Sequence, residues 1–192
     1  MSPKQDMGGR CYFFKEKKNG SLVKYYAPYC TDNFQIVSPK FSHEGYEWHS
    51  IEQAFQSLKF PIGSKLQVQI CEESPCNGES YHDYGIRVWR MGQTLTNLPD
   101  NWETEKLKLM LSLNLQKYLS KESFQKDLLS TIPHVLIGQP SSTKGWEYYN
   151  PRIQMLIRSY LKVGKCLKEV LEDINKKRSE DVEELLNDVG QD

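Results

Sequence analysis

The sequence has no excess of either charge, because its 25 lysines and arginines equal its 25 aspartates and glutamates in number. It therefore lacks the bulk positive charge that draws a whole domain onto nucleic acid or an anionic membrane, although a local basic patch stays open. It has no run of about 20 apolar residues, the length that a membrane-spanning helix needs. Its first residues contain no apolar segment typical of a secretion signal. We therefore expect a cytoplasmic protein without membrane contact, with the nucleus as an open alternative.

The sequence also lacks the spacings that hold metals. None of its five cysteines forms a Cys-x-x-Cys pair, and its four histidines stand in no ligand pattern. We predict no metal and no cofactor. Without a secretion signal disulfides are not expected either. The cysteines predicted to be free thiols are Cys11, Cys30, Cys71, Cys76 and Cys166.

The hydrophobic content is enough for one core. Among 192 residues, 38% are hydrophobic, with 11 Tyr, 7 Phe and 4 Trp. We predict a flexible N-terminus over residues 1–9 and a single domain over residues 10–174. From Lys176 onward most residues are charged, so residues 175–192 are expected to form a charged extension, either a solvated helix or a frayed tail.

The N-terminal part of the domain is expected to be a small β element. Phe13-Phe14 and Val23 to Tyr25 flank Asn19-Gly20, a dipeptide that tolerates the positive φ of a hairpin turn. A helix should begin after Ser50, which can cap it, since Gln53 follows in capping-box spacing. Pro61 should end that helix.

Later segments are expected to be mainly helical, so the predicted fold class is α+β and predominantly helical. We expect a loop insertion from Glu72 to Asp83 and then an element around Ile86 to Met91. A helix should follow from Asp100 or Asn101 to about Leu119, with Asp100 and Glu103 in capping spacing, and a short helix should begin at Ser120. The last two expected elements are a buried strand over His134 to Ile137, ended by Gly138, and a long helix capped by Asn150 with Pro151 in its first position.

The expected helix after Ser50 carries a polar face. Glu52, Gln56 and Lys59 recur at i, i+4 and i+7, so they share one side of the helix. A carboxylate and an amine at this spacing are typical of an exposed ion-pair face. The alternative is a site in which a buried carboxylate stabilises positive charge on a ribose ring, while a second group handles the leaving base or water.

The order of motifs along the chain resembles the NADAR (YbiA-like) family of N-glycosidases. The resemblance covers about residues 30 to 160. The matching residues are Asn33-Phe34, Trp48, Glu52, Gln56 and Lys59-Phe60, Arg90-Met91-Gly92, Trp102, Leu128 to Pro133, Trp146 and Asn150.

This resemblance implies a single YbiA-like domain that hydrolyses a bond between ribose and a base. Family members act on ribosylated pyrimidine intermediates of riboflavin synthesis or remove ADP-ribose from guanine in nucleic acid. It implies catalytic roles for Glu52 and Lys59. Glu52 could be the carboxylate beside the ribose, and Lys59 could lower the pKa of Glu52, hold a phosphate or, if desolvated, attack C1′. A nucleotide or ADP-ribosyl ligand is the expected partner, and a modified nucleic acid is a further candidate. The implied substrate-binding residues are Asn33, Phe34, Trp48, Gln56, Arg90, Gly92, Trp102, Trp146 and Asn150, with Trp48 or Trp102 stacking on a base and Arg90 holding a phosphate.

The chain also departs from the family pattern. Gly138 and Thr143 stand where the family has acidic residues, and Glu147 and Ile153 replace glycines. Glu147 could supply a lost carboxylate, and the segment 72–83 could reshape the pocket. These departures favour an alternative, a catalytically inactive domain that binds ADP-ribose, a nucleotide or, through its C-terminal helix, a protein partner.

Overall fold

The computed structural model describes residues 9–93, 98–141 and 145–190. The expected flexible segment 1–9 therefore lies outside the described residues except for Gly9, and Thr143 lies outside them too. In the described ranges the chain is a helix-rich α+β structure with two small antiparallel sheets, which agrees with the predicted fold class. No helix in these ranges combines the length and the apolar character needed to cross a membrane.

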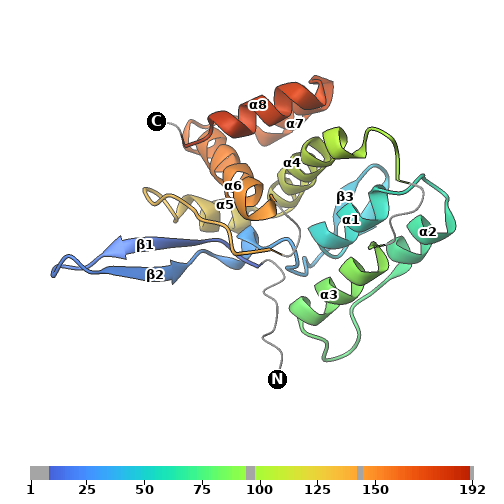
Figure 1. The fold of residues 1–192 in the computed structure, drawn as a ribbon, viewed down its shortest axis with the longest axis horizontal. Coiled ribbons are helices and arrows are strands. Elements are labelled where there is room, and N and C mark those ends of the chain that lie inside the picture. Colours follow the sequence, from blue (N-terminus) through green and yellow to red (C-terminus); the bar gives the residue numbers. More distant parts are fainter. Residues whose placement is uncertain (1–8, 94–97, 142–144, 191–192) are drawn as a thin grey trace.

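The two sheets are both hairpins. β1 (Tyr12–Glu16) pairs with β2 (Leu22–Tyr26), and Gly20 in the connecting loop has a φ of 78°, so the predicted hairpin is confirmed. β3 (Phe41–His43) pairs with β4 (Tyr46–Trp48) around a tight turn. Figure 1 shows the β1–β2 hairpin projecting away from the helices. The second hairpin lies against them, with β3 on the long helix α4 (Trp102–Ser120) and β4 on α1 (Ile51–Leu58).

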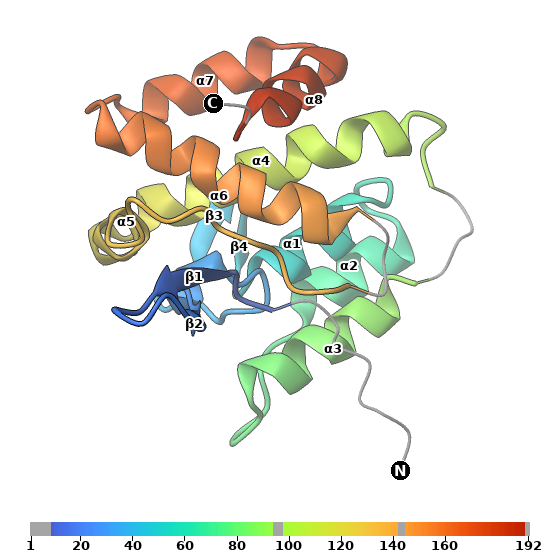
Figure 2. The same cartoon turned by 60° about the vertical axis from the view of Figure 1, so that its left-hand side comes forward.

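The helices are arranged around α4 (Trp102–Ser120), whose buried residues lie between Leu107 and Tyr118. It packs against α1 (Ile51–Leu58), α5 (Glu122–Leu129), α6 (Trp146–Lys162), α7 (Leu167–Lys176) and α8 (Ser179–Asp188). α2 (Lys65–Glu72) and α3 (Tyr81–Met91) pack on α1, and a short 3-10 helix, η1 (Tyr29–Thr31), contacts α5 and α6. Figure 2 shows α7 and α8 on one side of α4 and the group α1, α2 and α3 on the other.

α1 forms where its local sequence predicts it. The Ser50 hydroxyl accepts a hydrogen bond from the Gln53 amide at 3.1 Å, which satisfies one of the free N–H groups of the first turn. The helix ends at Leu58, three residues before Pro61. The predicted start and end of this helix are therefore confirmed.

The C-terminal region differs from the expected extension. α8 is helical, but Val182 and Leu186 are fully buried and belong to the main hydrophobic core. The helix packs against α4 and α6. The prediction of a solvated or frayed extension is therefore wrong, because the few apolar residues among the charges share one face at i and i+4.

Two further predictions about the second half are wrong. Residues 134–137 form no strand; only Ile137 pairs with Tyr12, in a single bridge, and Val135 is 65% exposed. α6 begins at Trp146 after Gly145, so Asn150 is inside the helix and not its cap. Pro151 is tolerated there although it cannot donate the hydrogen bond that would reach the Glu147 carbonyl.

The segment before α4 also needs correction. α2 was not predicted, and α3 begins at Tyr81 with Ser80 as its cap, so the loop expected from Glu72 to Asp83 is confined to residues 73–80. α4 starts at Trp102 with Asn101 as N-cap and no side-chain capping bond. The capping pattern expected between Asp100 and Glu103 is therefore not formed.

Candidate functional site

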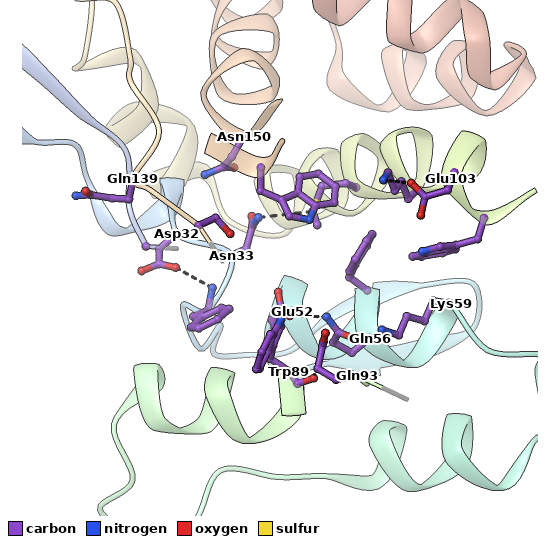
Figure 3. A pocket seen from close by; sticks show the side chains of 18 of the residues that line it. Asp32, Asn33, Glu52, Gln56, Lys59, Trp89, Gln93, Glu103, Gln139 and Asn150 are labelled. Carbon is purple, nitrogen blue, oxygen red and sulfur yellow. Dashed lines mark hydrogen bonds and ion pairs between the residues drawn. The ribbon is translucent and has the colours of Figure 1, made fainter. Parts of the chain in front are cut away.

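A cavity of about 220 Å³ lies between the loop after η1, α1, α3, α4, the start of α6 and the segment 139–141. Figure 3 shows side chains from these separate parts of the chain converging on it. The structure brings most of the predicted site residues to this cavity. Those that line it are Asn33, Phe34, Glu52, Gln56, Lys59, Trp102, Trp146 and Asn150.

α1 supplies the ionisable centre of the cavity. Glu52 lies in its first turn and is only 6% exposed. Gln56, one turn further on, donates its Nε2 amide hydrogen to Glu52 Oε1 at 2.7 Å. The Glu52 main-chain amide donates to the carbonyl of Asn33 at 3.0 Å, so the helix start is tied to the loop that forms another wall. The polar face of α1 therefore faces the protein interior and not bulk water.

Burial raises the pKa of Glu52 to about 7. The hydrogen bond from Gln56 and the charge of Lys59 both lower this pKa, and the nearby charge of Asp32 raises it further. The predicted effect of Lys59 thus has the right direction but is smaller than the effect of burial. A carboxyl group with a pKa near 7 can exchange a proton at neutral pH, as a general acid or base must.

Lys59 follows α1 directly and is 8% exposed. Burial lowers its pKa to about 8, and the charge of Glu52 opposes this change. In the view of Figure 3, Gln56 lies between Glu52 and Lys59. Lys59 is therefore an ammonium ion at neutral pH that is close to releasing its proton.

Aromatic rings form one wall of the cavity. Phe55 of α1 contacts Trp102 of α4 with ring centroids 5.2 Å apart, and Trp146 of α6 edge-on at 5.4 Å. Trp89 of α3 lines the cavity from another direction. Trp102 and Trp146 remain partly exposed. Their rings can therefore contact a flat ligand such as a base.

The loop after η1 places a second carboxylate at the cavity. Asp32 is 4% exposed, and its Oδ1 accepts a hydrogen bond from the Phe34 amide at 2.9 Å. Burial raises the pKa of Asp32, whereas the Phe34 bond and the charge of Lys117 lower it. Figure 3 shows Asp32 and Glu52 approaching the cavity from different elements. The site therefore holds two buried carboxyl groups, of which sequence reasoning found one.

A buried network of hydrogen bonds holds the loop that carries Asp32. The Tyr118 hydroxyl donates to Gln154 Oε1 at 2.6 Å and lies 3.0 Å from the Cys30 carbonyl oxygen. Gln154 Nε2 donates to Asn150 Oδ1 at 3.2 Å, and Asn150 Nδ2 donates to the Thr31 carbonyl at 3.2 Å. The network joins α4, α6 and η1, so it fixes the loop that carries Asp32.

The same network includes Lys117, a buried amine. Its Nζ donates to the carbonyl oxygens of Cys30 and Asp32. Burial lowers the pKa of Lys117 to about 8. Lys117 therefore holds the main chain of the loop and partly balances the charge of Asp32.

Three predicted site residues do not line the cavity. Trp48 is fully buried in the core, where its Nε1 donates to the His43 carbonyl at 3.3 Å, so stacking of Trp48 on a base is a wrong prediction. Arg90 is exposed and lies outside the lining, so its role in phosphate binding stays a prediction. Gly92 acts indirectly, because a Cβ there would come 1.9 Å from Gln56 Oε1. A side chain at position 92 would thus displace the amide that binds Glu52.

The departures from the family pattern have a structural explanation at Gly138. A Cβ on Gly138 would stand 2.2 Å from the carbonyl oxygen of Glu147, in the first turn of α6. The backbone as it stands therefore leaves no room for a carboxylate side chain at position 138. The side chain of Glu147 is exposed and Glu147 does not line the cavity, so it does not replace the missing acid.

Several cavity residues were not predicted. Lys106 and Met110 follow the predicted residue Trp102 at i+4 and i+8 on α4, so helical spacing was the available signal for these two. Trp89 lies in the last turns of α3 and Gln93 just after its C-cap, and neither had such a signal. Gly9, Gln139 and Ser141 come from irregular segments that carry no such signal. The unpredicted lining residues are Gly9, Asp32, Phe55, Trp89, Gln93, Leu98, Glu103, Lys106, Met110, Gln139 and Ser141.

No protein-family profile matches the chain, and no curated protein matches it. Among solved structures, the chain is similar to the NMR structure of the Escherichia coli protein YbiA, with a TM-score of 0.57 and 21% sequence identity. The match covers 70% of this chain and 78% of that chain. At this identity the likeness shows a YbiA-like fold and nothing finer.

Proposed function

We propose that the chain is an N-glycosyl hydrolase that cleaves the ribose–base bond of a ribosylated nucleotide or of an ADP-ribosyl-guanine adduct. One observation carries the proposal. Glu52 is buried at a cavity with its pKa raised to about 7, and Lys59 at the end of the same helix and aromatic rings line that cavity too. The YbiA-like fold supports the same reading, because the motif resemblance leads to that family independently.

In this mechanism the bond between C1′ and the base nitrogen breaks with its electron pair going to the base. Positive charge develops on the ribose ring, and the ionised Glu52 stabilises it in a site of low polarity. Water then forms the new C1′–O bond and gives its proton to Glu52. Lys59, an ammonium ion with its pKa lowered to about 8, gives a proton to the departing nitrogen.

The remaining lining residues suit the parts of such a substrate. Trp102 and Trp146 can hold the base by stacking. The amide oxygens of Asn33 and Gln56 are buried and make no hydrogen bond within the described part of the chain, which is unfavourable for a polar atom. Ribose hydroxyls or an exocyclic amine could supply the missing donors after small side-chain rotations. Asp32 offers a further acceptor beside them.

The test is turnover of two substrates, ADP-ribosylated guanosine and a ribosylaminopyrimidine phosphate. Glu52→Gln keeps the size of the side chain and removes its charge, so it should lower kcat by at least about 100-fold. Glu103→Gln is the matched control, because Glu103 also lines the cavity but its side chain is 80% exposed. Absence of turnover on both substrates, or an active Glu52→Gln variant, would contradict the proposal.

A second candidate is a nucleotide-binding domain without catalysis. It is favoured by Gly138, where the backbone leaves no space for a carboxylate, and by the outward position of Glu147. Calorimetry with ADP-ribose separates the two functions: binding without turnover supports this candidate. If neither binding nor turnover occurs, a protein-binding role through the charged outer face of α8 is the remaining reading.

A further inference from the structure

The β1–β2 hairpin and its flanking residues concentrate positive charge in a chain whose net charge is zero. Residues 10–29 contain five cations, and Glu16 is the one acid among them. Lys15, Lys17, Lys18 and Lys24 are all exposed. In Figure 1 this hairpin stands out from the helical body, so its charges are presented to solvent. The zero net charge of the chain did not exclude a local basic patch, and these residues form one on the hairpin.

One face of this hairpin, called the outer face below, alternates cations with aromatic rings. The strand register puts Tyr12 opposite Tyr26 and Phe14 opposite Lys24, all on the same side of the ribbon. Lys24 Nζ lies 3.9 Å from the centre of the Tyr12 ring and 5.0 Å from that of Tyr26. The Arg10 guanidinium lies 4.8 Å from the Tyr26 ring and 4.2 Å from the Tyr29 ring.

The aromatic rings of the outer face are accessible. Tyr26, Tyr29 and Phe14 are 52%, 45% and 43% exposed. On the opposite side of the ribbon, Phe13 is buried and stacks on His134 with ring centroids 4.6 Å apart. Tyr25, on this same inner face, stacks on Phe13 with ring centroids 6.1 Å apart and is 42% exposed. The inner face therefore exposes one ring, whereas the outer face exposes Phe14 and Tyr26 with Tyr29 beside them, so the exposed rings are concentrated on the outer face.

The outer face leads to the cavity. Arg10 directly follows Gly9, which lines the cavity. Lys24 Nζ donates to Gln139 Oε1 at 3.5 Å, and Gln139 lines the cavity as well. The charge of Arg10 also lowers the pKa of Asp32 inside the site. Figure 3 shows Gln139 and Asp32 on the same side of the pocket. A polymer lying on the outer face would therefore reach the mouth of the cavity.

We propose that the outer face of the hairpin, formed by Arg10, Tyr12, Phe14, Lys24, Tyr26 and Tyr29, binds single-stranded nucleic acid. Exposed rings next to cations suit a strand with unpaired bases, because rings stack on bases while the cations contact phosphates. A duplex hides its base faces and would use the cations alone. Binding of the strand to the outer face does not depend on the proposed function. Only the further step, in which a modified nucleotide of the bound strand enters the cavity, rests on it.

The test uses the full chain and an unmodified, fluorescein-labelled single-stranded DNA of about 15 nucleotides, the length of a typical binding groove. Binding is measured by fluorescence anisotropy at several salt concentrations. The outer-face variant is Lys24→Ala with Tyr26→Ala. The matched control is Lys15→Ala with Tyr25→Ala, which removes the same two residue types from the inner face of the same strands. Circular dichroism checks that both variants are folded.

The wild type should bind, and the outer-face variant should bind at least about fivefold more weakly, as expected for loss of one stacked base. Its plot of log affinity against log salt concentration should be shallower by about 0.7, the value for one lost phosphate contact. The inner-face control should stay within about twofold of the wild type. Equal weakening in both variants, or no binding of the wild type, would overturn the proposal.

Further results separate this proposal from a membrane-binding surface and from the proposed hydrolase activity. Binding to phosphatidylserine-containing vesicles without binding to the oligonucleotide would assign the surface to a membrane and overturn the proposal. Hydrolysis of a free nucleotide without oligonucleotide binding would reject only the surface, and oligonucleotide binding without hydrolysis would reject only the glycosidase.

Discussion

Gln56 donates an amide hydrogen to Glu52 across 2.7 Å, and both side chains are buried at the cavity wall. The bond favours the ionised carboxylate, whereas burial favours the neutral acid, and burial has the larger effect on the pKa. Gly92 leaves the space that the Gln56 amide occupies. The protonation state of Glu52 at neutral pH therefore depends on a glutamine one helical turn away and on the glycine that follows α3.

The pH dependence of hydrolysis should follow Glu52 and Lys59. If Glu52 acts ionised and Lys59 protonated, kcat/KM should rise through a pKa of about 7 and fall through a pKa of about 8, giving a narrow bell, because kcat/KM follows the pKa values of the free enzyme. Gln56→Leu removes a bond that lowers the pKa of Glu52, so the rising limb should move to higher pH. A profile of Gln56→Leu that matches the wild type would contradict this assignment.

Glu52→Gln should change how stability depends on pH. The pKa of Glu52 rises from 4.5 to about 7 on folding, so its ionisation is unfavourable in the folded state. The wild type should therefore lose stability relative to Glu52→Gln as pH rises from about 4.5 to 7, by roughly 3 kcal/mol in total. Urea unfolding at several pH values measures this difference. A difference that is constant over that range would show that Glu52 is solvated.

Gly138→Ala should destabilise the chain. The added Cβ would come 2.2 Å from the Glu147 carbonyl oxygen, so the segment before Gln139 or the first turn of α6 must shift. Such overpacking costs about 1 to 3 kcal/mol in the free energy of unfolding. Gln139→Ala, at the next position, is the control and should cost less. Equal stability of Gly138→Ala and the wild type in urea would mean that the two segments are not in contact.

Tyr118→Phe should weaken the buried network under the Asp32 loop. It removes the hydroxyl that donates to Gln154 Oε1 and leaves that buried oxygen without its donor. The free energy of unfolding should fall by about 1 to 3 kcal/mol with an unchanged denaturant slope. Tyr25→Phe is the control, since Tyr25 is 42% exposed. The network would carry little stability if both variants unfold at the same urea concentration.

Leu186→Ala should destabilise the domain even though it lies near the C-terminus. Leu186 is fully buried in the main core, and truncation of a buried leucine costs about 2 to 5 kcal/mol. Glu184→Ala, on the exposed side of the same helix, should change stability by less than about 0.5 kcal/mol. Thermal unfolding of both variants provides the comparison. If Leu186→Ala unfolded at the same temperature as the wild type, α8 would be a solvated extension and not part of the core.

Local features of this fold were predictable because they depend on neighbouring residues. The cap of α1, the turn of the β1–β2 hairpin and the shared face of Glu52, Gln56 and Lys59 all follow from spacings of a few residues. Where Asp32 lies was not predictable, because a carboxylate after a short 3-10 helix has no local signature of burial. The wrong strand at residues 134–137 has a similar cause: an apolar run shows hydrophobicity but not the partner strand that a sheet requires.

The order of residues along α1 is enough to show which of its side chains share a face, but what that face contacts depends on how distant elements pack. Trp48 and Trp102 were both candidates for stacking on a base, yet Trp48 is fully buried in the core and Trp102 lines the cavity. Helical and strand periodicity define directions within an element, whereas burial depends on the packing of elements far apart in the chain. For that reason the ionisation of Glu52 was decided by α3, α4 and the Asp32 loop closing around it, and not by α1 alone.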